Sequence, residues 1–559
     1  MRERAGRPGT PVRPLARRLA SVEVALSARA ALCLSLPLVV GFVADRHLDA
    51  ILFDIGALWA VSQDGLDQWT RRGPRMLAVA VAAALGVAAG GVVATRVGTT
   101  LAVALCYAVV ALVAGLVEAT FGATAGAYLI VGATLGVGLD PVGRVPLTAG
   151  LMAAGALWVW AVARVANLRR RRANQRAVLA AAFDDLGLLA RAVGSPAFSA
   201  VRAGAVASLD LAQDVVSRPN ATAVGDALFA ALVVALRAGE AVSYLEGRGQ
   251  GADASLVEAL EEVARHLREG ETLHALTHLE RLAGDEALAP AVRRALAPPS
   301  AEELAAAGAV VSSHRATRPA VPVRERLRFG AILAVAVVGA DLLGVALHGP
   351  HAFWLPMSVV FILRPDLGPV MARALARTLG TVLGVGVAAL VALVGHSPVD
   401  LIVLSCVMAA IVPPAQRRGN VAAVVAFTPL VFVFLGLAAS AQSLFVTRIV
   451  DTALAAALVL VIDGLLWTTA PSRRPAALVA AARAALAHYG AVADADPATR
   501  HLARRAALRA LARARAATHL TRGELRAVRR GVLGARGELD ALEAEIDATT
   551  VRLLERPVG

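Results

Sequence analysis

Residues 354–384 read WLPMSVVFILRPDLGPVMARALARTLGTVLG, and the order of residue types in this stretch decides how we interpret the chain. A short apolar segment leads into a loop with Arg364, Arg373 and Arg377, and an apolar segment with glycines four residues apart follows. Residues 59–90, WAVSQDGLDQWTRRGPRMLAVAVAAALGVAAG, repeat this order of features. The chain therefore carries one module twice, and each copy lies within a set of long apolar segments.

The composition of the 559-residue chain favours a membrane protein. Hydrophobic residues make up 57% of the chain, charged residues only 18%, and the mean hydropathy is +0.65. Soluble proteins carry nearer a quarter charged residues, so burial in lipid explains the deficit most simply. The net charge is +14, and the basic residues are all Arg, which suggests GC-rich codons and a bacterial source. This positive charge is typical of nucleic-acid binding or of the cytoplasmic side of a membrane protein.

Twelve apolar segments approach the roughly 20 residues that a helix needs to cross a bilayer. They form two sets of six, and the second segment of each set is short. The first set comprises 28–44, 48–63, 76–95, 99–117, 121–139 and 145–166, and the second comprises 329–347, 352–363, 374–394, 399–412, 421–439 and 449–467. We therefore predict an all-α membrane protein with two tandem six-helix transmembrane bundles.

The positions of the Arg residues decide between the two interpretations of the charge. If the N-terminus lies inside, alternation of the segments places most Arg clusters, including the run at 169–172, on the cytoplasmic side. The predicted outer loops hold few Arg residues, with Arg46, Arg96 and Arg144 as exceptions. This distribution follows the positive-inside rule in both halves. We predict a multi-pass protein of the bacterial cytoplasmic (inner) membrane with both termini in the cytoplasm.

Five regions follow from this organisation. They are a basic cytoplasmic segment at 1–27, a first transmembrane bundle at 28–168, a cytoplasmic helical region at 169–326, a second transmembrane bundle at 327–470 and a C-terminal cytoplasmic helical region at 471–559. Both cytoplasmic regions show the helical period of apolar residues among many acids and bases.

Several motifs of the second half resemble those of the FUSC family, which is named for fusaric acid resistance proteins. The motifs are Phe353-Trp354, Leu363-Arg364-Pro365-Asp366, Arg377-Thr378-Leu379-Gly380-Thr381 with Gly384, and Arg448 with Asp451-Thr452. The family is related to aromatic acid exporters and to plant aluminium-activated malate transporters. The resemblance implies proton-coupled export of small aromatic carboxylic acids, and relatives make a homodimer plausible. In the first half Gln63-Asp64-Gly65 stands where the second half has Arg-Pro-Asp, so the resemblance does not imply that the two halves are functionally symmetric.

The loop of the second half is one candidate for the substrate pathway. Arg364 and Arg377 could face an anion that enters from the cytoplasm, because a guanidinium group donates to a carboxylate through a planar fork. Together with Asp366 they could instead be ordinary cytoplasmic anchors with an Asp–Arg pair. Trp354 could stack on an aromatic substrate or lie in the belt of aromatic residues at the membrane interface.

Charged residues inside the apolar segments form a second candidate. Arg448 and Asp451 lie one helical turn apart and can pair, and Asp341 is predicted at a similar depth in another helix. In the functional interpretation one carboxylate binds a proton and Arg448 attracts the anion. In the structural interpretation the three residues form a satisfied ion pair that orients the last helix.

Glycines four residues apart form the third candidate feature, and they favour close approach of two helices. Gly86 and Gly90 in the first half and Gly380 and Gly384 in the second have this spacing. A gap beside them could alternatively admit substrate.

The sequence lacks a phosphate-binding motif of the form G-x-x-x-x-G-K-[ST] and any evident nucleophile arrangement. We therefore predict no enzymatic activity, no cofactor and no metal, and a solvated face for the i,i+4 pair His274 and His278. Small organic anions, protons and lipid are the predicted partners, and nucleic acid is not. Two alternatives to an exporter stay open. One is a passive organic-anion channel, and the other is a membrane-anchored scaffold that acts through its cytoplasmic helices, as the Arg-rich stretch 501–530 suggests.

Overall fold

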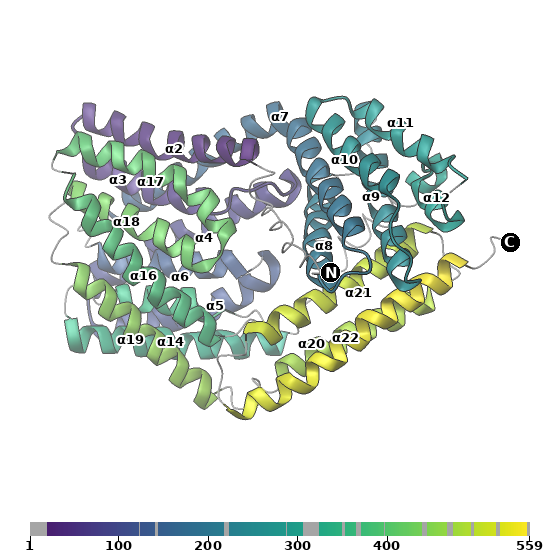
Figure 1. The fold of residues 1–559 in the computed structure, drawn as a ribbon. Coiled ribbons are helices and arrows are strands. Elements are labelled where there is room, and N and C mark those ends of the chain that lie inside the picture. Colours follow the sequence, from purple (N-terminus) through teal and green to yellow (C-terminus); the bar gives the residue numbers. More distant parts are fainter. Residues whose placement is uncertain are drawn as a thin grey trace, which may run out of the picture.

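The computed structural model is built from helices alone within the residues that it describes (Figure 1). These residues are 20–555 without 122, 140–143, 217–222, 287, 306–322, 349–352, 365–369, 396, 439–443, 467–472, 493–496 and 521–525. The all-helical class that the sequence predicts is confirmed.

The helices fall into four groups along the chain. The first half contains α2 (Ala20–Val43), α3 (His47–Val61), α4 (Trp69–Arg96), α5 (Thr100–Phe121), α6 (Ala123–Gly138) and α7 (Val145–Arg191). The region after it contains α8 (Phe198–Val215), α9 (Ala223–Gly247), α10 (Ala254–Glu269), α11 (Thr272–Ala283) and α12 (Pro290–Leu296). The second half contains α14 (Val323–His348), α15 (Trp354–Ile362), α16 (Val370–Ala392), α17 (Pro398–Arg418), α18 (Asn420–Ala438) and α19 (Leu444–Leu466), and the C-terminal region contains α20 (Arg473–Ala491), α21 (Pro497–Leu520) and α22 (Arg526–Glu555).

Ten of the described helices are long and apolar enough to cross a membrane. Nine of them coincide with predicted segments: α2, α4, α5, α7, α14, α16, α17, α18 and α19. The tenth, Val224–Gly247 of α9, has 94% of its apolar window buried inside the protein, so it forms the core of the helical region after the first half. The chain is thus a multi-pass membrane protein.

Three predicted segments give shorter helices than the sequence suggested. Helix α3 has 15 residues and α15 has 9, which at 1.5 Å per residue gives about 22 Å and 14 Å. The hydrocarbon core of a bilayer is about 30 Å thick, so neither helix crosses it alone. Helix α6, with 16 residues, is also short. Nine of the twelve predicted spans thus coincide with helices of sufficient length, and the arrangement in two six-helix bundles stays a prediction.

The two halves interlock. Helix α14, the first of the second half, packs along α5, and helix α2, the first of the first half, packs along α17. Helix α3 also contacts α18, and α15 contacts α6. Each half therefore covers part of the other.

Small residues allow close helix contacts in each half. On α4, Gly86 and Gly90 lie against the backbone of Leu129 and Ala133 on α6. On α16, Gly380 and Gly384 lie against the Val424 and Thr428 side chains of α18. A Cβ atom at Gly86 or Gly90 would overlap with backbone atoms, so these two positions of α4 accept only glycine at this separation of the helices.

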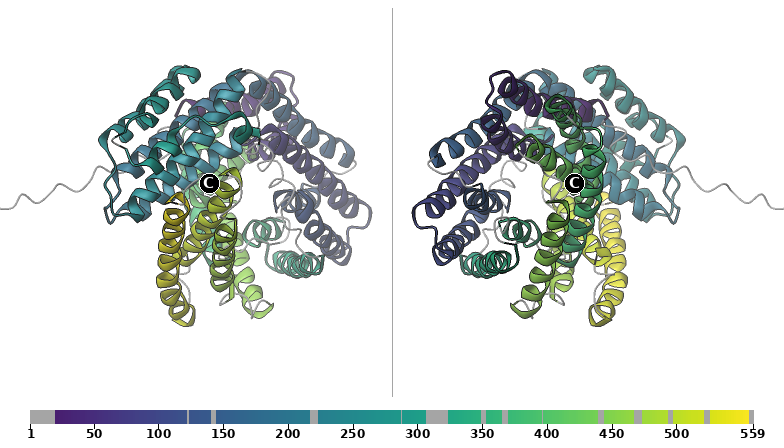
Figure 2. Two further views of the ribbon diagram at one scale, coloured as in Figure 1. Left: turned by 90° about the vertical axis from the view of Figure 1, so that its right-hand side faces the viewer. Right: turned by 90° about the vertical axis from the view of Figure 1, so that its left-hand side faces the viewer.

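Helix α7 joins the membrane helices to the helical region beyond them. Its 47 residues correspond to about 70 Å, and its second part packs against α8, α9 and α10 (Figure 1). The C-terminal helices pack on the same region, because α22 contacts α9 and α21 contacts α8. Figure 2 shows the yellow C-terminal helices beside the teal helices at one end of the molecule.

Buried ion pairs hold the C-terminal helices in place. Arg202 of α8 binds Glu543 at 3.1 Å and Asp547 at 2.8 Å, both on α22. Arg505 and Arg509 of α21 both bind Asp210 of α8. Two arginines of the Arg-rich stretch 501–530 therefore bind an acid of this protein.

Candidate functional site

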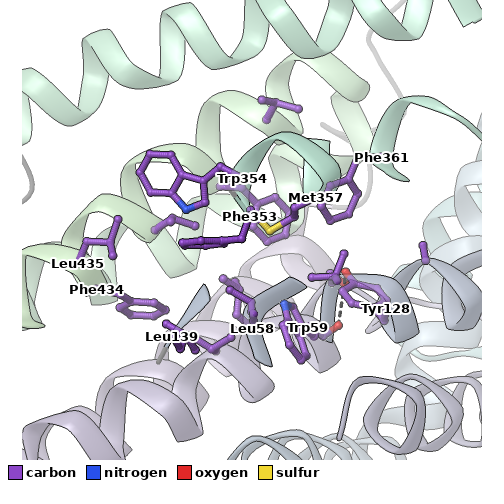
Figure 3. A pocket seen from close by; sticks show the side chains of 18 of the residues that line it. Leu58, Trp59, Tyr128, Leu139, Phe353, Trp354, Met357, Phe361, Phe434 and Leu435 are labelled. Atoms are coloured by element: carbon purple, nitrogen blue, oxygen red, sulfur yellow. Dashed lines mark hydrogen bonds between the residues drawn. The ribbon is translucent and has the colours of Figure 1, made fainter. Parts of the chain in front are cut away.

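A cavity of about 780 Å³ lies where the two halves meet (Figure 3). The first half contributes α3, α6 and the start of α7, and the second half contributes α15, α16, α18 and α19. Both short helices, α3 and α15, therefore line the cavity. Short or interrupted helices at corresponding positions of two repeats are a usual feature of binding sites in transporters.

Aromatic side chains from both halves form much of the cavity wall. The Trp59 and Tyr128 rings lie 5.7 Å apart, and Tyr128 meets Phe361 of the other half edge-on at 6.5 Å. Figure 3 shows Trp59 and Tyr128 on one side of the space and Trp354, Met357 and Phe361 on the other. The Tyr128 hydroxyl is 2.7 Å from the Ser62 hydroxyl, so polar groups interrupt the apolar surface at this end.

Five arginines line the cavity, and no acidic residue does so among the residues that the structure describes. They are Arg144, Arg364, Arg373, Arg377 and Arg448. Such a lining attracts anions and repels cations, because charges in surroundings of low dielectric constant interact strongly.

The contacts of these arginines differ. Arg144 binds Asp49 at 2.7 Å, and the Arg373 Nε donates to the Ile362 carbonyl at 3.0 Å. None of the ion pairs in the described chain includes Arg364, Arg377 or Arg448. Arg377 and Arg448 instead lie over aromatic rings, with the guanidinium carbon of Arg377 4.6 Å from the centre of Phe361 and that of Arg448 5.3 Å from Trp354. Both guanidinium groups therefore keep donors for a bound anion.

The corresponding loop of the first half is neutralised internally. Asp64 accepts ion pairs from Arg29 and from the buried Arg72 at 3.4 Å, and Arg75 binds Asp67 at 3.1 Å. The sequence difference at residues 63–65 thus has a physical consequence, because the neutral Gln63 stands where the second half carries Arg364. The charge that faces the cavity comes mainly from the second half.

The structure places the remaining predicted site residues as follows. Asp341 is buried on α14 within electrostatic range of Tyr107, and no ion pair of the described residues joins it to Arg448 or Asp451. Asp451 is also buried and acts electrostatically on Arg448. Trp354, Arg364, Arg377 and Arg448 all line the cavity. Asp366 lies outside the described residues.

Sequence reasoning missed Arg144, Tyr128 and Asp54. Arg144 is one of the arginines that break the positive-inside pattern, and that exception is a signal that could have pointed to the cavity. Tyr128 has no such signal, since it is a lone aromatic in an apolar helix, whereas Asp54 is a charged residue inside a predicted apolar segment, which is the signal that pointed to Asp341.

One His-containing cluster lies away from the cavity. Glu262, His266 and His278 bring ligand atoms within 4.8 Å of one another, so His278 approaches His266 rather than His274. Arg265 donates to Glu262 at 3.0 Å, so a guanidinium cation already binds the carboxylate of this cluster.

Comparisons with known proteins agree with the motifs of the second half. A comparison with curated proteins found no match, and a comparison with solved structures found none either. Residues 333–462 match the family model described as fusaric acid resistance protein-like, and this range includes Trp354, Arg364, Arg377 and Arg448. The predicted family resemblance is confirmed for residues 333–462 of this membrane protein, which are similar to fusaric acid resistance proteins.

Proposed function

We propose that this protein is a secondary transporter that exports small aromatic carboxylates across the cytoplasmic membrane of a bacterium. The observation that carries the proposal is the cavity between the halves, where Arg364, Arg377 and Arg448, which take part in none of the ion pairs of the described residues, lie with aromatic rings and without an acid among the described lining residues. A guanidinium fork binds a carboxylate through two parallel hydrogen bonds. The rings favour a flat apolar body next to it.

The size of the cavity fits this class of substrate. A volume of about 780 Å³ falls within the roughly 300–1,000 Å³ of sites that enclose small molecules. In our proposal the substrate ring packs near Trp354 and Phe361, and its carboxylate lies between Arg377 and Arg448. The two halves then rearrange around the site and open it to either side in turn, as repeat-built transporters do.

The wider setting belongs to the same proposal. The two sequence halves act as six-helix repeats, both termini and the two helical regions lie in the cytoplasm, and protons supply the coupling. The protein carries out no covalent chemistry, works with lipid around it, and forms a homodimer.

A passive anion channel is the main alternative, because the same arginines would also attract anions into a pore. A carrier exchanges labelled for unlabelled substrate faster when substrate is present on both sides, whereas a channel does not. The scaffold alternative loses support from the C-terminal region, since Arg505 and Arg509 bind Asp210 instead of presenting a free basic face.

The proposal is tested with purified protein in proteoliposomes. We expect uptake of labelled 4-hydroxybenzoate, competition by other aromatic acids, and weak competition by acetate or the neutral benzamide. Protein-free vesicles give the diffusion of the neutral acid, which is subtracted. Uptake equal to that of protein-free vesicles would exclude the function.

Paired variants test the site itself. Arg377→Gln and Arg448→Ala should lower uptake at least tenfold, because each removes a charged hydrogen-bond donor. Arg96→Gln makes the same kind of change at an exposed residue of α4 and should leave uptake unchanged. Equal rates for Arg377→Gln and Arg96→Gln would remove the arginine site from the mechanism.

A further inference from the structure

Asp54 is a fully buried carboxyl group without a partner. It lies in the middle of α3 with 0% of its surface exposed. Neither carboxylate oxygen has a hydrogen-bond partner in the described chain, and Asp54 takes part in none of its ion pairs. An ionised carboxylate is very unfavourable in such a place, whereas the neutral acid is tolerated.

Charged groups on the neighbouring helices do not compensate Asp54. Helix α3 packs against α2, α4, α7 and α18. Arg29 of α2 and Arg72 of α4 both bind Asp64. The sequence of α18 has no charged residue, and α7 has none between its start and Arg164. Cys33 of α2 is a titratable group within electrostatic range, and a thiol is mostly neutral at pH 7.

The helix opposite Asp54 contains a proline at the same level. Helices α2 and α3 form an antiparallel hairpin in which Gly41 lies against Ala50. One turn farther along both helices, this register places Pro37 opposite Asp54. Pro37 has no N–H to donate to the Cys33 carbonyl, which instead accepts from the Trp158 Nε1 at 3.3 Å. Helix α2 can therefore bend next to the buried acid.

The helix that carries Asp54 both lines the cavity and contacts the second half of the chain. The cavity is lined by Ile51, Ile55 and Leu58 of α3, which are three, one and four residues from Asp54 in the sequence. Ala50 and Ala57 share the face of Asp54, and they belong to an apolar cluster that includes residues of α2, α17 and α18. A rearrangement that responds to substrate in the cavity therefore also changes the surroundings of Asp54.

We infer that Asp54 is the proton-binding carboxyl of the transport cycle, and this inference rests on the proposed function. The side chain is the neutral acid in the conformation described here. When α2 bends at Pro37 and the halves move, water reaches the carboxyl, the O–H bond breaks, its electron pair stays on the carboxylate and the proton passes to water. The carboxylate takes up a proton on the opposite side of the membrane before it is buried again.

The inference has an electrical consequence. Entry of one proton and exit of one substrate anion both move positive charge inward. An interior-negative membrane potential and an inward proton gradient therefore drive the same cycle. If no proton enters, only the membrane potential drives the export of the anion.

The first experiment compares Asp54→Asn with wild type in proteoliposomes. Asparagine imitates the neutral acid and cannot release a proton. We expect exchange of labelled for unlabelled 4-hydroxybenzoate at equal pH to stay within about twofold of wild type. Accumulation driven by a pH gradient should fall at least tenfold, to the level of vesicles without a gradient. Gradient-driven accumulation as in wild type would overturn the inference, and so would a parallel loss of exchange and thermal stability, which indicates a structural role.

Asp45→Asn is the matched control. Asp45 lies in the turn between α2 and α3, its side chain is fully exposed, and its φ of 54° is one that asparagine also adopts. This variant should keep both exchange and gradient-driven accumulation.

The second experiment does not depend on transport. Infrared difference spectra of purified wild type and Asp54→Asn at neutral pH should show the C=O stretch of one protonated carboxyl that only wild type has. The absence of this band would overturn the inference even if transport is found. If the band is present but wild type moves no organic acid, the proposed function fails while proton binding by Asp54 stands.

Discussion

The guanidinium carbon of Arg377 lies 4.6 Å from the centre of the Phe361 ring, although the two residues lie on either side of the loop between α15 and α16. A ring face attracts a cation without neutralising its charge. The N–H groups of Arg377 thus stay available, and the group is held in one orientation. A carboxylate that enters the cavity meets a donor fork that is already in place.

Arg377→Lys separates charge from geometry. Lysine keeps the positive charge but loses the planar fork and most of the stacking on Phe361. We expect the KM for 4-hydroxybenzoate to rise about tenfold, which corresponds to roughly 1.4 kcal/mol, with a smaller change in maximal rate. Arg169→Lys, at an exposed position of α7, is the control. An unchanged KM in the Arg377 variant would contradict an anchoring role.

Trp354→Leu tests the aromatic part of the site. The ring of Trp354 supports Arg448 and meets Phe432 edge-on at 6.4 Å. Leucine preserves an apolar surface but loses these interactions, which are each worth about 0.5–1.5 kcal/mol. The preference for aromatic over aliphatic acids should fall roughly 3- to 10-fold in competition assays. A uniform loss for all acids would instead assign Trp354 a structural role.

Gly86→Ala tests a close contact between α4 and α6. The added Cβ would overlap with the Leu129 carbonyl oxygen and the Ala133 backbone nitrogen. The helices must separate, and overpacking of this kind costs about 1–3 kcal/mol. The melting temperature in detergent, followed by tryptophan fluorescence, should therefore fall. Gly386→Ala on α16 has no atom within 4 Å of the added carbon and should melt at or above the wild-type temperature. Equal melting of the two variants would argue against the contact.

The contact between α8 and α22 should weaken in acid. Burial favours the neutral form of Glu543, but a hydrogen bond from Arg515 and the charges of Arg202 and Arg515 outweigh it and hold the pKa of Glu543 below its usual value. The ionised group therefore stabilises the folded state above the unfolded pKa of about 4.3, and this stabilisation is lost as the pH falls through the lower folded value. The protection of α22 from hydrogen exchange, corrected for the intrinsic exchange rate at each pH, should fall below about pH 4.

Two variants check the sign of this effect. Glu543→Gln should remove much of the pH dependence of the protection of α22 from hydrogen exchange. Burial raises the pKa of the neighbouring Asp547, so that residue works in the opposite sense and stabilises the acid form. Asp547→Asn should therefore make the loss of this protection steeper as the pH falls. If the protection of α22 depends on pH in the same way in wild type and both variants, Glu543 and Asp547 are excluded as the source of that dependence.

The sequence predicts the helices well because apolar length and Arg distribution are local properties. Nine of the predicted segments are helices that can cross a membrane, and the soluble character of the region around α9 is visible from its charged neighbours. Helix length at α3 and α15 is less predictable. Their apolar residues continue into the cavity wall, and nothing in composition alone tells a wall residue from a lipid-facing one.

Only those residues of the site that belong to the second half could be predicted from the sequence. Trp354, Arg364, Arg377 and Arg448 follow from motifs, and the structure brings them to one cavity. The depth of Asp341 along α14 could be read from the sequence, but not the face it occupies, because that depends on which helix packs against α14. The significance of Asp54 likewise depends on the absence of partners in the described surroundings, which only packing reveals.

The crossed packing of α2 on α17 and of α14 on α5 has a consequence for biosynthesis. A ribosome takes roughly 10–40 s to make the residues between the end of α5 and the start of α14. Throughout that interval the newly inserted first half holds two helix flanks whose eventual neighbours do not yet exist. Lipid or a membrane chaperone must occupy those flanks, and a truncated chain that ends before α14 would offer them to the quality-control proteases of the cell.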